Sequence, residues 1–271
     1  MNNYKSLFWH SQLLGIKSIL KGFLNKESLK RIVCPMDFSR YYELPVVLNN
    51  LRLKKNSKIL DISSPKLLAS YISSKHSSIQ LWGIDKFKDE ISNWSTIIGN
   101  KKNLVLEYGD STKLKYPDNF FDEVYSISVI EHVGNNKNTD DSKMMKEVYR
   151  VLKKKGRFYF TTIISRSPEV VFKNKNYYSN NQLKKDKVFF CRIYSYSEIV
   201  KRLLNTADFK VIKEEMCNYR FPIFETIFNK TMPYSAVLGF LNYFVGPMSI
   251  RSQKVSKPIP FRAEYFCILQ K

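Results

Sequence analysis

The sequence is poor in glycine and cysteine. It has nine glycines among 271 residues, and no two of them stand closer than seven positions apart. This spacing excludes a Gly-x-Gly-x-x-Gly turn, the usual phosphate-binding signature of dinucleotide-binding folds. The four cysteines show no spacing typical of metal ligands and are too few for a disulfide framework, which favours a reducing compartment: Cys34, Cys191, Cys217 and Cys267.

Acidic residues are also scarce. The chain has 24 Asp and Glu against 45 Lys and Arg, a formal net charge of +21. A basic chain attracts phosphates, anionic lipid headgroups and acidic substrates. The same excess is expected if lysine is simply abundant throughout the sequence, so the charge leaves both interpretations open.

No long hydrophobic run is free of helix breakers. The stretch Thr231–Ile250 carries no formal charge, but prolines, glycines and an asparagine interrupt it: Pro233, Gly239, Asn242, Gly246 and Pro247. Such a stretch is a poor membrane span. The N-terminus lacks the pattern of a cleavable signal peptide. We therefore expect a cytoplasmic protein, with peripheral membrane attachment as the alternative.

Hydrophobic residues make up 44% of the chain, enough for a sizeable core, and they fall into alternating strand and helix patterns. Predicted strands are Lys58–Ile62, Ile79–Ile84, Leu104–Glu107, Phe121–Ser126, Arg157–Ile164, Phe209–Cys217 and Phe261–Gln270. Predicted helices are Lys66–Ser73, Asp89–Ile98, Asp141–Leu152 (ending before Gly156) and Tyr196–Asn205. Alternation at this spacing requires parallel pairing with right-handed crossovers. The fold class is α/β, a doubly wound and mostly parallel sheet.

The remaining segments divide the chain. Residues 1–52 form an N-terminal helical extension, residues 53–218 and 261–271 the main domain, and residues 219–260 an aromatic insertion or lid. The extension begins with a basic amphipathic helix, Tyr4–Leu24, which we expect to break near Gly15. It either packs on the domain or lies on a membrane surface. Together with the insertion it is a candidate apolar cap over the site, with a basic rim that contacts anionic membrane.

Three aspartates lie at the ends of strands of the predicted sheet: Asp61, Asp85 and Asp110. The carboxyl ends of parallel strands meet at one edge, where doubly wound folds bind ligands. An acid ending the second strand is suited to accept hydrogen bonds from both hydroxyls of a ribose. Each aspartate alone is also a good helix cap, but three in series predict a nucleotide-like ligand.

At these residues the chain resembles the class I S-adenosylmethionine-dependent methyltransferases, and in particular their type 11 group. The matching segments are Asp61, Asp85, Gly109-Asp110, Pro117–Asp122, Ser128–Val133 and Glu147–Lys153 with Gly156. The resemblance covers about 40% of the chain, residues 58–164. It implies a Rossmann-like methyltransferase fold of seven strands in the order 3-2-1-4-5-7-6, and S-adenosyl-L-methionine as cofactor.

The resemblance also implies a cofactor site. Asp85 is expected to hold the ribose and Phe87 to flank the adenine. The full set of expected cofactor-binding residues is Asp61, Ile62, Ser63, Ser64, Asp85, Lys86, Phe87, Gly109, Asp110, Ser111, Ser128 and Val129. One departure stands out, because the family has glycines after its first acid where this chain has Ser63-Ser64-Pro65. Either the turn binds in a modified shape, helped by serine hydroxyls, or cofactor affinity is reduced or lost.

For the chemistry, His132 and its neighbour Glu131 are the candidate catalytic residues. His132 is suited to act as a base or to position an acceptor hydroxyl; alternatively, the Glu-His pair only braces the edge of the sheet. Arg40, Tyr41 and Tyr42 are candidate substrate contacts that close over the pocket, and packing of both rings in the core is the alternative. No residues have the spacing of a metal site.

Three classes of function remain open. The first is a methyltransferase acting on a small molecule, a glycan or a lipid precursor. The second is a catalytically silent, methyltransferase-like binding protein, which the missing glycines favour. The third is a nucleic-acid methyltransferase, which only the net charge favours, since the segment after the fourth strand lacks an Asn-Pro-Pro-aromatic motif.

Overall fold

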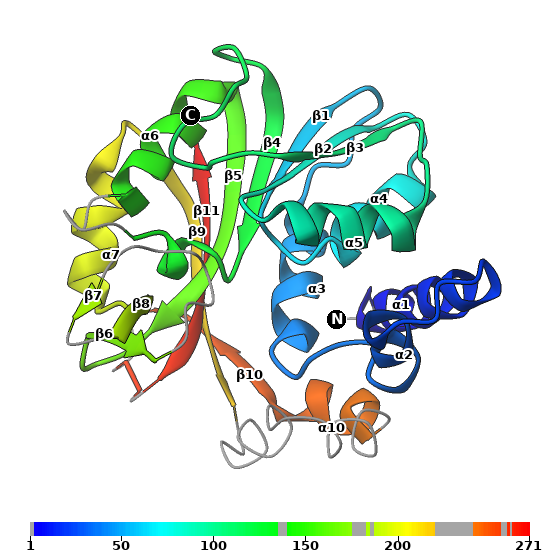
Figure 1. The fold of residues 1–271 in the computed structure, drawn as a ribbon. Helices are drawn as coiled ribbons and strands as arrows, with labels where there is room; N and C mark the ends of the chain where they lie inside the picture. Colours follow the sequence, from blue (N-terminus) through cyan, green and yellow to red (C-terminus); the bar gives the residue numbers. More distant parts are fainter. Residues whose placement is uncertain are drawn as a thin grey trace.

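The computed structural model describes residues 3–134, 140–174, 183–184, 187–219, 241–255, 259–260 and 262–271. Its centre is an eight-stranded sheet in the order β10-β9-β11-β5-β4-β1-β2-β3 (Figure 1). The expected order 3-2-1-4-5-7-6 is confirmed, with β11 as the seventh strand and β9 as the sixth. The difference is one additional edge strand, β10.

Five strands of the sheet are parallel: β1 (Lys58–Ile62), β2 (Gln80–Asp85), β3 (Leu104–Tyr108), β4 (Phe121–Ile127) and β5 (Leu152–Ile164). The remaining pairings are antiparallel: β5 with β11 (Ala263–Gln270), β11 with β9 (Lys210–Tyr219), and β9 with β10 (Ile250–Gln253). Strands β11 and β10 therefore run against the other strands, whereas β9 runs with them. In β1, Asp61 is in register with Gly83 on one side and Tyr125 on the other. The carboxyl ends of β1, β2 and β4 therefore form one edge, as the sequence predicted.

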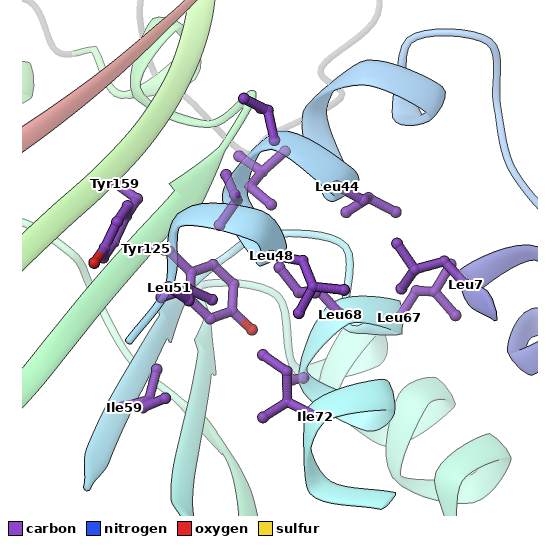
Figure 2. Packing of buried hydrophobic residues seen from close by; sticks show 14 of the residues in the cluster. Leu7, Leu44, Leu48, Leu51, Ile59, Leu67, Leu68, Ile72, Tyr125 and Tyr159 are labelled. Carbon is purple, nitrogen blue, oxygen red and sulfur yellow. The ribbon is translucent and has the colours of Figure 1, made fainter. Parts of the chain in front are cut away.

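Helices cover both faces of the sheet. Around one apolar cluster lie α1 (Asn3–Leu20), α3 (Arg40–Asn50), α4 (Leu67–Lys75) and α5 (Lys88–Ile98); around the other lie α6 (Asp140–Val151) and α7 (Tyr196–Arg202). Figure 2 shows the first cluster, where Leu48 of α3 lies next to Leu68 of α4 and beside Tyr125. Helix α3 is thus part of the core, which fixes its first turn next to the ligand-binding edge.

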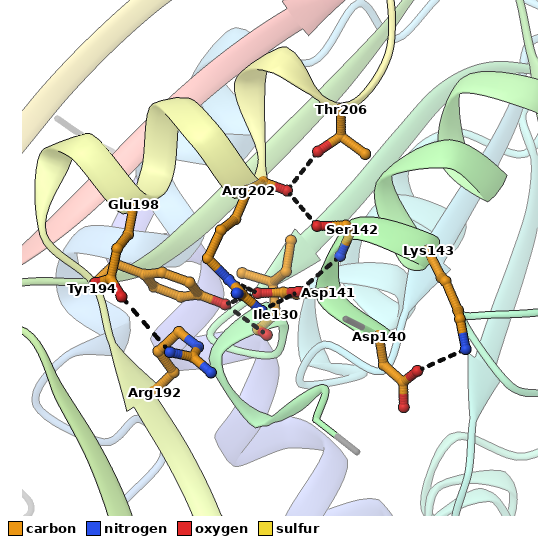
Figure 3. A network of polar contacts seen from close by, with 10 residues as sticks. All are labelled: Ile130, Asp140, Asp141, Ser142, Lys143, Arg192, Tyr194, Glu198, Arg202 and Thr206. Atoms are coloured by element: carbon orange, nitrogen blue, oxygen red, sulfur yellow. Dashed lines mark hydrogen bonds and ion pairs between the residues drawn. The ribbon is translucent and has the colours of Figure 1, made fainter. Parts of the chain in front are cut away.

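The second face is fastened by a buried carboxylate. Asp141, at the start of α6, accepts hydrogen bonds from the guanidinium of Arg202 (2.8 Å) and the hydroxyl of Tyr194 (3.1 Å) (Figure 3). Tyr194 follows β8 (Lys187–Ile193), which pairs with β6 (Glu169–Lys173) and β7 (Leu183–Lys184) in a small antiparallel sheet. The sequence predicts an irregular segment for Ser165–Cys191, but the structure forms this three-stranded sheet there. Tyr177 and Tyr178 of the segment lie outside the described residues.

Two boundaries differ from the prediction. Helix α1 continues through Gly15, because a Cβ there would come 2.7 Å from the carbonyl oxygen of Ser28 and glycine lets α2 (Lys26–Val33) approach. Helix α6 ends at Val151, and Gly156 lies inside β5 rather than just past a helix end. Helix α2 itself was not predicted, since its eight residues hold few apolar positions.

Within the expected insertion, residues 219–260, the structure describes α10 (Leu241–Ser249) and β10, which pairs with β9. This part is therefore attached to the main sheet. The sequence also predicts a helix from the spacing of Phe221, Phe224, Ile227 and Phe228, and these residues lie outside the described ones. Among the helices that the structure describes, none combines the length and hydropathy needed to cross a bilayer.

Candidate functional site

A pocket of about 690 Å³ opens at the carboxyl ends of β1, β2 and β4. Its floor is the strand-end turns, and residues of α2, of the following segment Cys34–Asp37 and of the first turn of α3 line its other side. This volume suits a cofactor together with part of a small acceptor. The N-terminal extension is therefore a wall of the site rather than a separate attachment.

The turn after β1 has an unusual backbone. Ser63 adopts φ 51°, and Ser128, at the exit of β4, also has φ 51°. Both serines line the pocket. Left-handed conformations cost a non-glycine residue about 1 kcal/mol, and such strain tends to gather at functional sites. The chain thus keeps the backbone shape expected of a glycine turn without the glycine.

A buried lysine supports this turn. The ammonium of Lys66 donates to Asp61 Oδ1 (3.0 Å), the carbonyl of Ser64 (3.0 Å) and the carbonyl of Ile84 (3.1 Å). Lys66 is 1% exposed, and its stem passes beside Gly83, where a Cβ would lie 3.3 Å from the lysine Cδ. The glycine that matters here is thus in β2, where it leaves room for the lysine.

Asp61 itself is closed off from the pocket. Its carboxylate also accepts from the amide of Ser64 (3.0 Å) and the hydroxyl of Tyr125 (3.0 Å), and no part of the residue is exposed. Burial raises the pKa of Asp61, and the ammonium of Lys66 opposes that shift. Asp61 therefore shapes the turn from beneath, and direct contact with a ligand would require Lys66 to move.

The next two strand ends do reach the pocket. Asp85 ends β2, is 8% exposed, and holds the following turn by accepting from the amide of Phe87 (2.9 Å). Asp110, after β3, accepts from the amide and the hydroxyl of Thr112 (2.8 and 2.7 Å). In each case the turn uses one carboxylate oxygen, Oδ1. The other oxygen of Asp85 is the one suited to a ribose hydroxyl.

A second buried carboxylate joins α3 to the exit of β4. Glu43 is fully buried, pairs with Arg40, and accepts from the hydroxyls of Ser128 and Thr161, the latter at 2.8 Å. Ser128 also donates its amide to Thr161 Oγ1 (3.0 Å). Arg40 and Ser128 both line the pocket, so Glu43 fixes two of its walls relative to each other.

His132 lies in the short helix η1 (Ile130–His132) and lines the pocket. Its Nδ1 is 2.7 Å from the carbonyl of Phe190, and because a carbonyl only accepts, Nδ1 carries the proton in the neutral ring. The lone pair is then on Nε2. Burial lowers the pKa of His132 to about 4, so the ring is neutral at physiological pH and suited to accept a hydrogen bond, although it is a weak proton acceptor.

Glu131 points elsewhere. It is 1% exposed, does not line the pocket, and accepts from the hydroxyl of Thr162 (3.0 Å). Burial raises its pKa to about 8, and the nearby Glu43 adds to this shift. The carboxyl is thus largely protonated at neutral pH. It braces the strand exit beneath His132 rather than facing a ligand.

The charge of the pocket is opposite to that of the chain. Seven acidic side chains line it against four basic ones, although the whole sequence has a net charge of +21. Two of the acids are paired within the wall, Glu27 with Arg31 and Asp37 with Lys30. The group around the cofactor edge (Asp85, Asp89, Glu90 and Asp110) has no basic partner within ion-pair distance among the described residues. The pocket therefore favours cationic ligands.

The structure brings most of the predicted site residues together. Those lining the pocket are Arg40, Ser63, Ser64, Asp85, Lys86, Phe87, Asp110, Ser111, Ser128, Val129 and His132. Those not lining it are Tyr41, Tyr42, Asp61, Ile62, Gly109 and Glu131. Tyr41 packs against Tyr4 and Gly246, and the hydroxyl of Tyr42 donates to Glu215, so both rings belong to the core beside β9 and α10.

The sequence did not predict the pocket wall opposite the strand ends, nor the buried residues that hold the pocket walls in place. Lys30, Arg31, Asp37 and Trp94 line the pocket without any motif that marks them, and the guanidinium of Arg31 stacks on Trp94 at 3.9 Å. Glu43 directly follows the candidate residues Arg40, Tyr41 and Tyr42, and its spacing of three from Arg40 was the available signal for an ion pair. In the described part of the chain, no group of three or more His, Cys, Asp or Glu is arranged to hold a metal ion.

Comparison with known proteins identifies the part of the chain that carries the strand-end half of the pocket. Residues 60–160 match a family model described as a methyltransferase domain, type 11. The chain is 26% identical over 176 residues to a phosphoethanolamine N-methyltransferase of Plasmodium falciparum, covering 64% of this chain and 61% of that protein. It is 31% identical over 120 residues to phosphoethanolamine N-methyltransferase 3 of Arabidopsis thaliana, covering 44% of this chain and 23% of that protein. The chain thus spans about three fifths and about a quarter of these relatives.

Among solved structures, the chain is similar to coclaurine N-methyltransferase bound to N-methylheliamine and SAH. The TM-score is 0.53 at 13% identity, covering 84% of this chain and 71% of that one. At this identity the likeness concerns the fold alone. The family match and the motif residues that it contains carry the assignment: the segment 60–160 is a class I, type 11-like, S-adenosylmethionine-dependent methyltransferase domain.

Proposed function

We propose that this protein transfers a methyl group from S-adenosylmethionine to a small-molecule amine. The observation that carries the proposal is the acid-lined pocket in a strongly basic chain, at the strand ends of a methyltransferase domain. A sulfonium cofactor and an ammonium acceptor are both cations, and a carboxylate-rich pocket raises the local concentration of each.

In this proposal the cofactor lies across the strand ends. Asp85 accepts from its ribose hydroxyls, Phe87 flanks the adenine, and Asp110 with Ser111 borders the base. The methionine end lies above Ser63 and Ser64. Because Lys66 neutralises Asp61, the cofactor ammonium needs another acceptor, and backbone carbonyls of the strained turn are suited to that role.

The acceptor then lies between Arg40, Ser128 and His132. Methyl transfer from a sulfonium is an in-line displacement with a neutral leaving group, so the protein mainly aligns the acceptor and excludes water. An amine attacks only when neutral, so the acceptor gives its proton to solvent before the transfer. Nε2 of the neutral His132 is then suited to accept a hydrogen bond from the amine N–H and so to orient the lone pair. Glu43 holds Arg40 and Ser128 in place during this step.

The names of the two curated relatives support an amine acceptor of the phosphoethanolamine class, that is, a lipid precursor. Such a molecule carries a cation and an anion. The acids of the pocket suit its ammonium, while Lys30 and Arg40 on the opposite wall suit its phosphate. An amine without phosphate and an alcohol are the competing acceptors, and a direct assay separates them.

The test is transfer of a labelled methyl group from S-adenosylmethionine to separate acceptors: phosphoethanolamine, ethanolamine, a simple alcohol and RNA. We expect label in an amine and none in the alcohol or in RNA. Asp85→Asn should lose activity, whereas Asp208→Asn, an exposed acid far from the pocket, should keep it. Transfer to RNA alone would replace the proposal by the nucleic-acid alternative.

One observation favours a second candidate, a catalytically silent binding protein. The turn after β1 contains no glycine, and its acid is sealed by Lys66. If S-adenosylhomocysteine binds but no acceptor is methylated by the wild type, this candidate replaces the enzyme. If neither cofactor form binds, both are excluded.

A further inference from the structure

Helix α1 carries an apolar stripe on its outward face. Trp9, Leu13, Ile16 and Leu20 are spaced by four, three and four residues, which places them in a narrow arc of one helix face. They are 52%, 52%, 42% and 80% exposed, respectively. Four large exposed apolar residues in one row are unusual on a protein surface, where such residues are normally scattered singly.

The inward face of the same helix is fully used. Leu7, Phe8, Leu14 and Gly15 are buried, and Ser11 donates to the carbonyl of Pro35 at 2.7 Å. Gln12 also donates to the carbonyl of Ile32 (3.0 Å) in α2. Because these contacts fasten α1 to α2 and the segment after it, α1 does not need its outer face for packing. The stripe is therefore presented by a fixed helix rather than by one waiting to fold onto its own domain.

Helix α10 extends the apolar surface. The ring centroid of Tyr243 lies 4.8 Å from that of Phe8 and 6.3 Å from that of Trp9, which places α10 beside α1. Leu241, Phe244 and Met248, spaced for one face of α10, are 47%, 53% and 70% exposed. Helix α10 has no charged residue. Two neighbouring helices thus each expose an apolar row.

The charges along α1 itself are all positive. Lys5 and Lys17 lie on either side of it on α1, and Lys21 and Lys26 follow the helix; all four are exposed. No acidic residue occurs between Asn3 and Lys26, and the first one, Glu27, is paired with Arg31. An apolar stripe with a tryptophan, bordered by lysines, is the pattern of a helix that lies in the interface of an anionic membrane.

We propose that α1, with α10 beside it, docks this protein on the surface of an anionic bilayer. Charge decides against a second copy of the chain as the occupant, because two such faces in contact would oppose the four lysines of each copy while neither α1 nor α10 supplies a carboxylate to balance them. Since α1 packs on α2, which lines the pocket, the docked protein would hold its pocket close to the membrane. The proposal does not depend on the identity of the acceptor.

The test is co-sedimentation of the full chain with vesicles of phosphatidylcholine alone and with about one third phosphatidylserine. We expect binding to the anionic vesicles at low salt, weaker binding at high salt, and little binding to the neutral ones. Trp9 is the only one of the three tryptophans classed as exposed, so its emission should shift to the blue on binding.

Matched variants locate the surface. Leu13→Ser/Leu20→Ser should weaken vesicle binding by about tenfold or more, since both side chains would leave the apolar interface. Val105→Ser/Val211→Ser, a control pair of exposed valines on β3 and β9, should bind like the wild type. Absence of binding at low salt, or equal binding by the leucine variant, overturns the proposal. A wild-type dimer that the leucine variant dissociates without vesicles would assign the stripe to a second copy instead.

Discussion

Lys66 shows how a single residue replaces a glycine-rich turn. Its ammonium donates hydrogen bonds to the carboxylate of Asp61 and to the carbonyls of Ser64 and Ile84. These contacts lie below the turn and hold it in place. The cost is a buried ion pair, which contributes little net stability but becomes expensive when one partner is removed. The sequence alone did not reveal this role, because Lys66 differs from any surface lysine only through its distant partners Gly83 and Ile84.

Lys66→Met should therefore destabilise the protein by about 3–5 kcal/mol, because it leaves the Asp61 carboxylate buried without its cation. The measurement is urea unfolding, with Lys75→Met, an exposed lysine at the end of α4, as control. The double variant Lys66→Met/Asp61→Asn should recover part of the loss. A loss below about 1 kcal/mol in the single variant would mean that the pair does not support the turn.

At the scale of elements, the site depends on two turns with the same backbone shape and different supports. Ser63 follows β1 and its side chain makes no hydrogen bond within the described structure, whereas Ser128 follows β4 and donates its hydroxyl to Glu43 of α3. Both residues have φ 51°. The strain is therefore shared, but only at Ser128 does the side chain of the strained residue itself bond to another element.

Because of this difference, replacing serine by glycine should have opposite effects on stability at positions 63 and 128. Ser63→Gly should stabilise the protein by up to about 1 kcal/mol, since glycine adopts a positive φ freely. Ser128→Gly relieves the same strain but removes a hydrogen bond to a buried carboxylate, a loss of about 1.5–3 kcal/mol, so it should destabilise. Thermal or urea unfolding of both variants checks the pair. Stabilisation by both would show that the link between Glu43 and Ser128 is weak.

Elements and strand order were predictable where local patterns decide them. Apolar runs ending in Asp61, Asp85 and Asp110 located the binding edge, and their spacing required parallel pairing. Helix α2 and strand β10 were missed, because each is short and depends on partners far along the chain: α1 for the helix and β9 for the strand. The pocket wall built by α2 was therefore invisible to sequence reasoning, while the strand-end half of the site was not.

For the whole molecule, burial of Glu131 predicts a pH dependence of stability. Its pKa is raised to about 8 in the folded protein, whereas an unfolded glutamate titrates near 4.5. The folded state thus holds a proton that the unfolded state has lost, so this contribution is present below about pH 4.5 and is lost as pH rises towards 8.

Glu131→Gln keeps the shape and removes the titration. Relative to the wild type, the variant should gain stability steadily between about pH 5 and 8, by at most about 1.4 kcal/mol per pH unit. Burial lowers the pKa values of His10 and His132 to about 4, so both residues change the stability only below about pH 6.5. They do so in the wild type and in the variant alike, and their contribution cancels in the difference. A constant difference across this range would show that Glu131 is already ionised in the folded protein.

The central claim is that the acid-ended strand edge binds S-adenosylmethionine despite a turn without glycine. Isothermal titration of the wild type with S-adenosylhomocysteine tests it most directly, with Asp85→Ala as the variant and Asp208→Ala as the control. We predict saturable binding at one site. It should weaken by about 1.5–3 kcal/mol in Asp85→Ala, the value of hydrogen bonds to a charged group, and remain unchanged in Asp208→Ala. Equal affinity in a folded Asp85→Ala protein, or no binding by the wild type, would contradict this account.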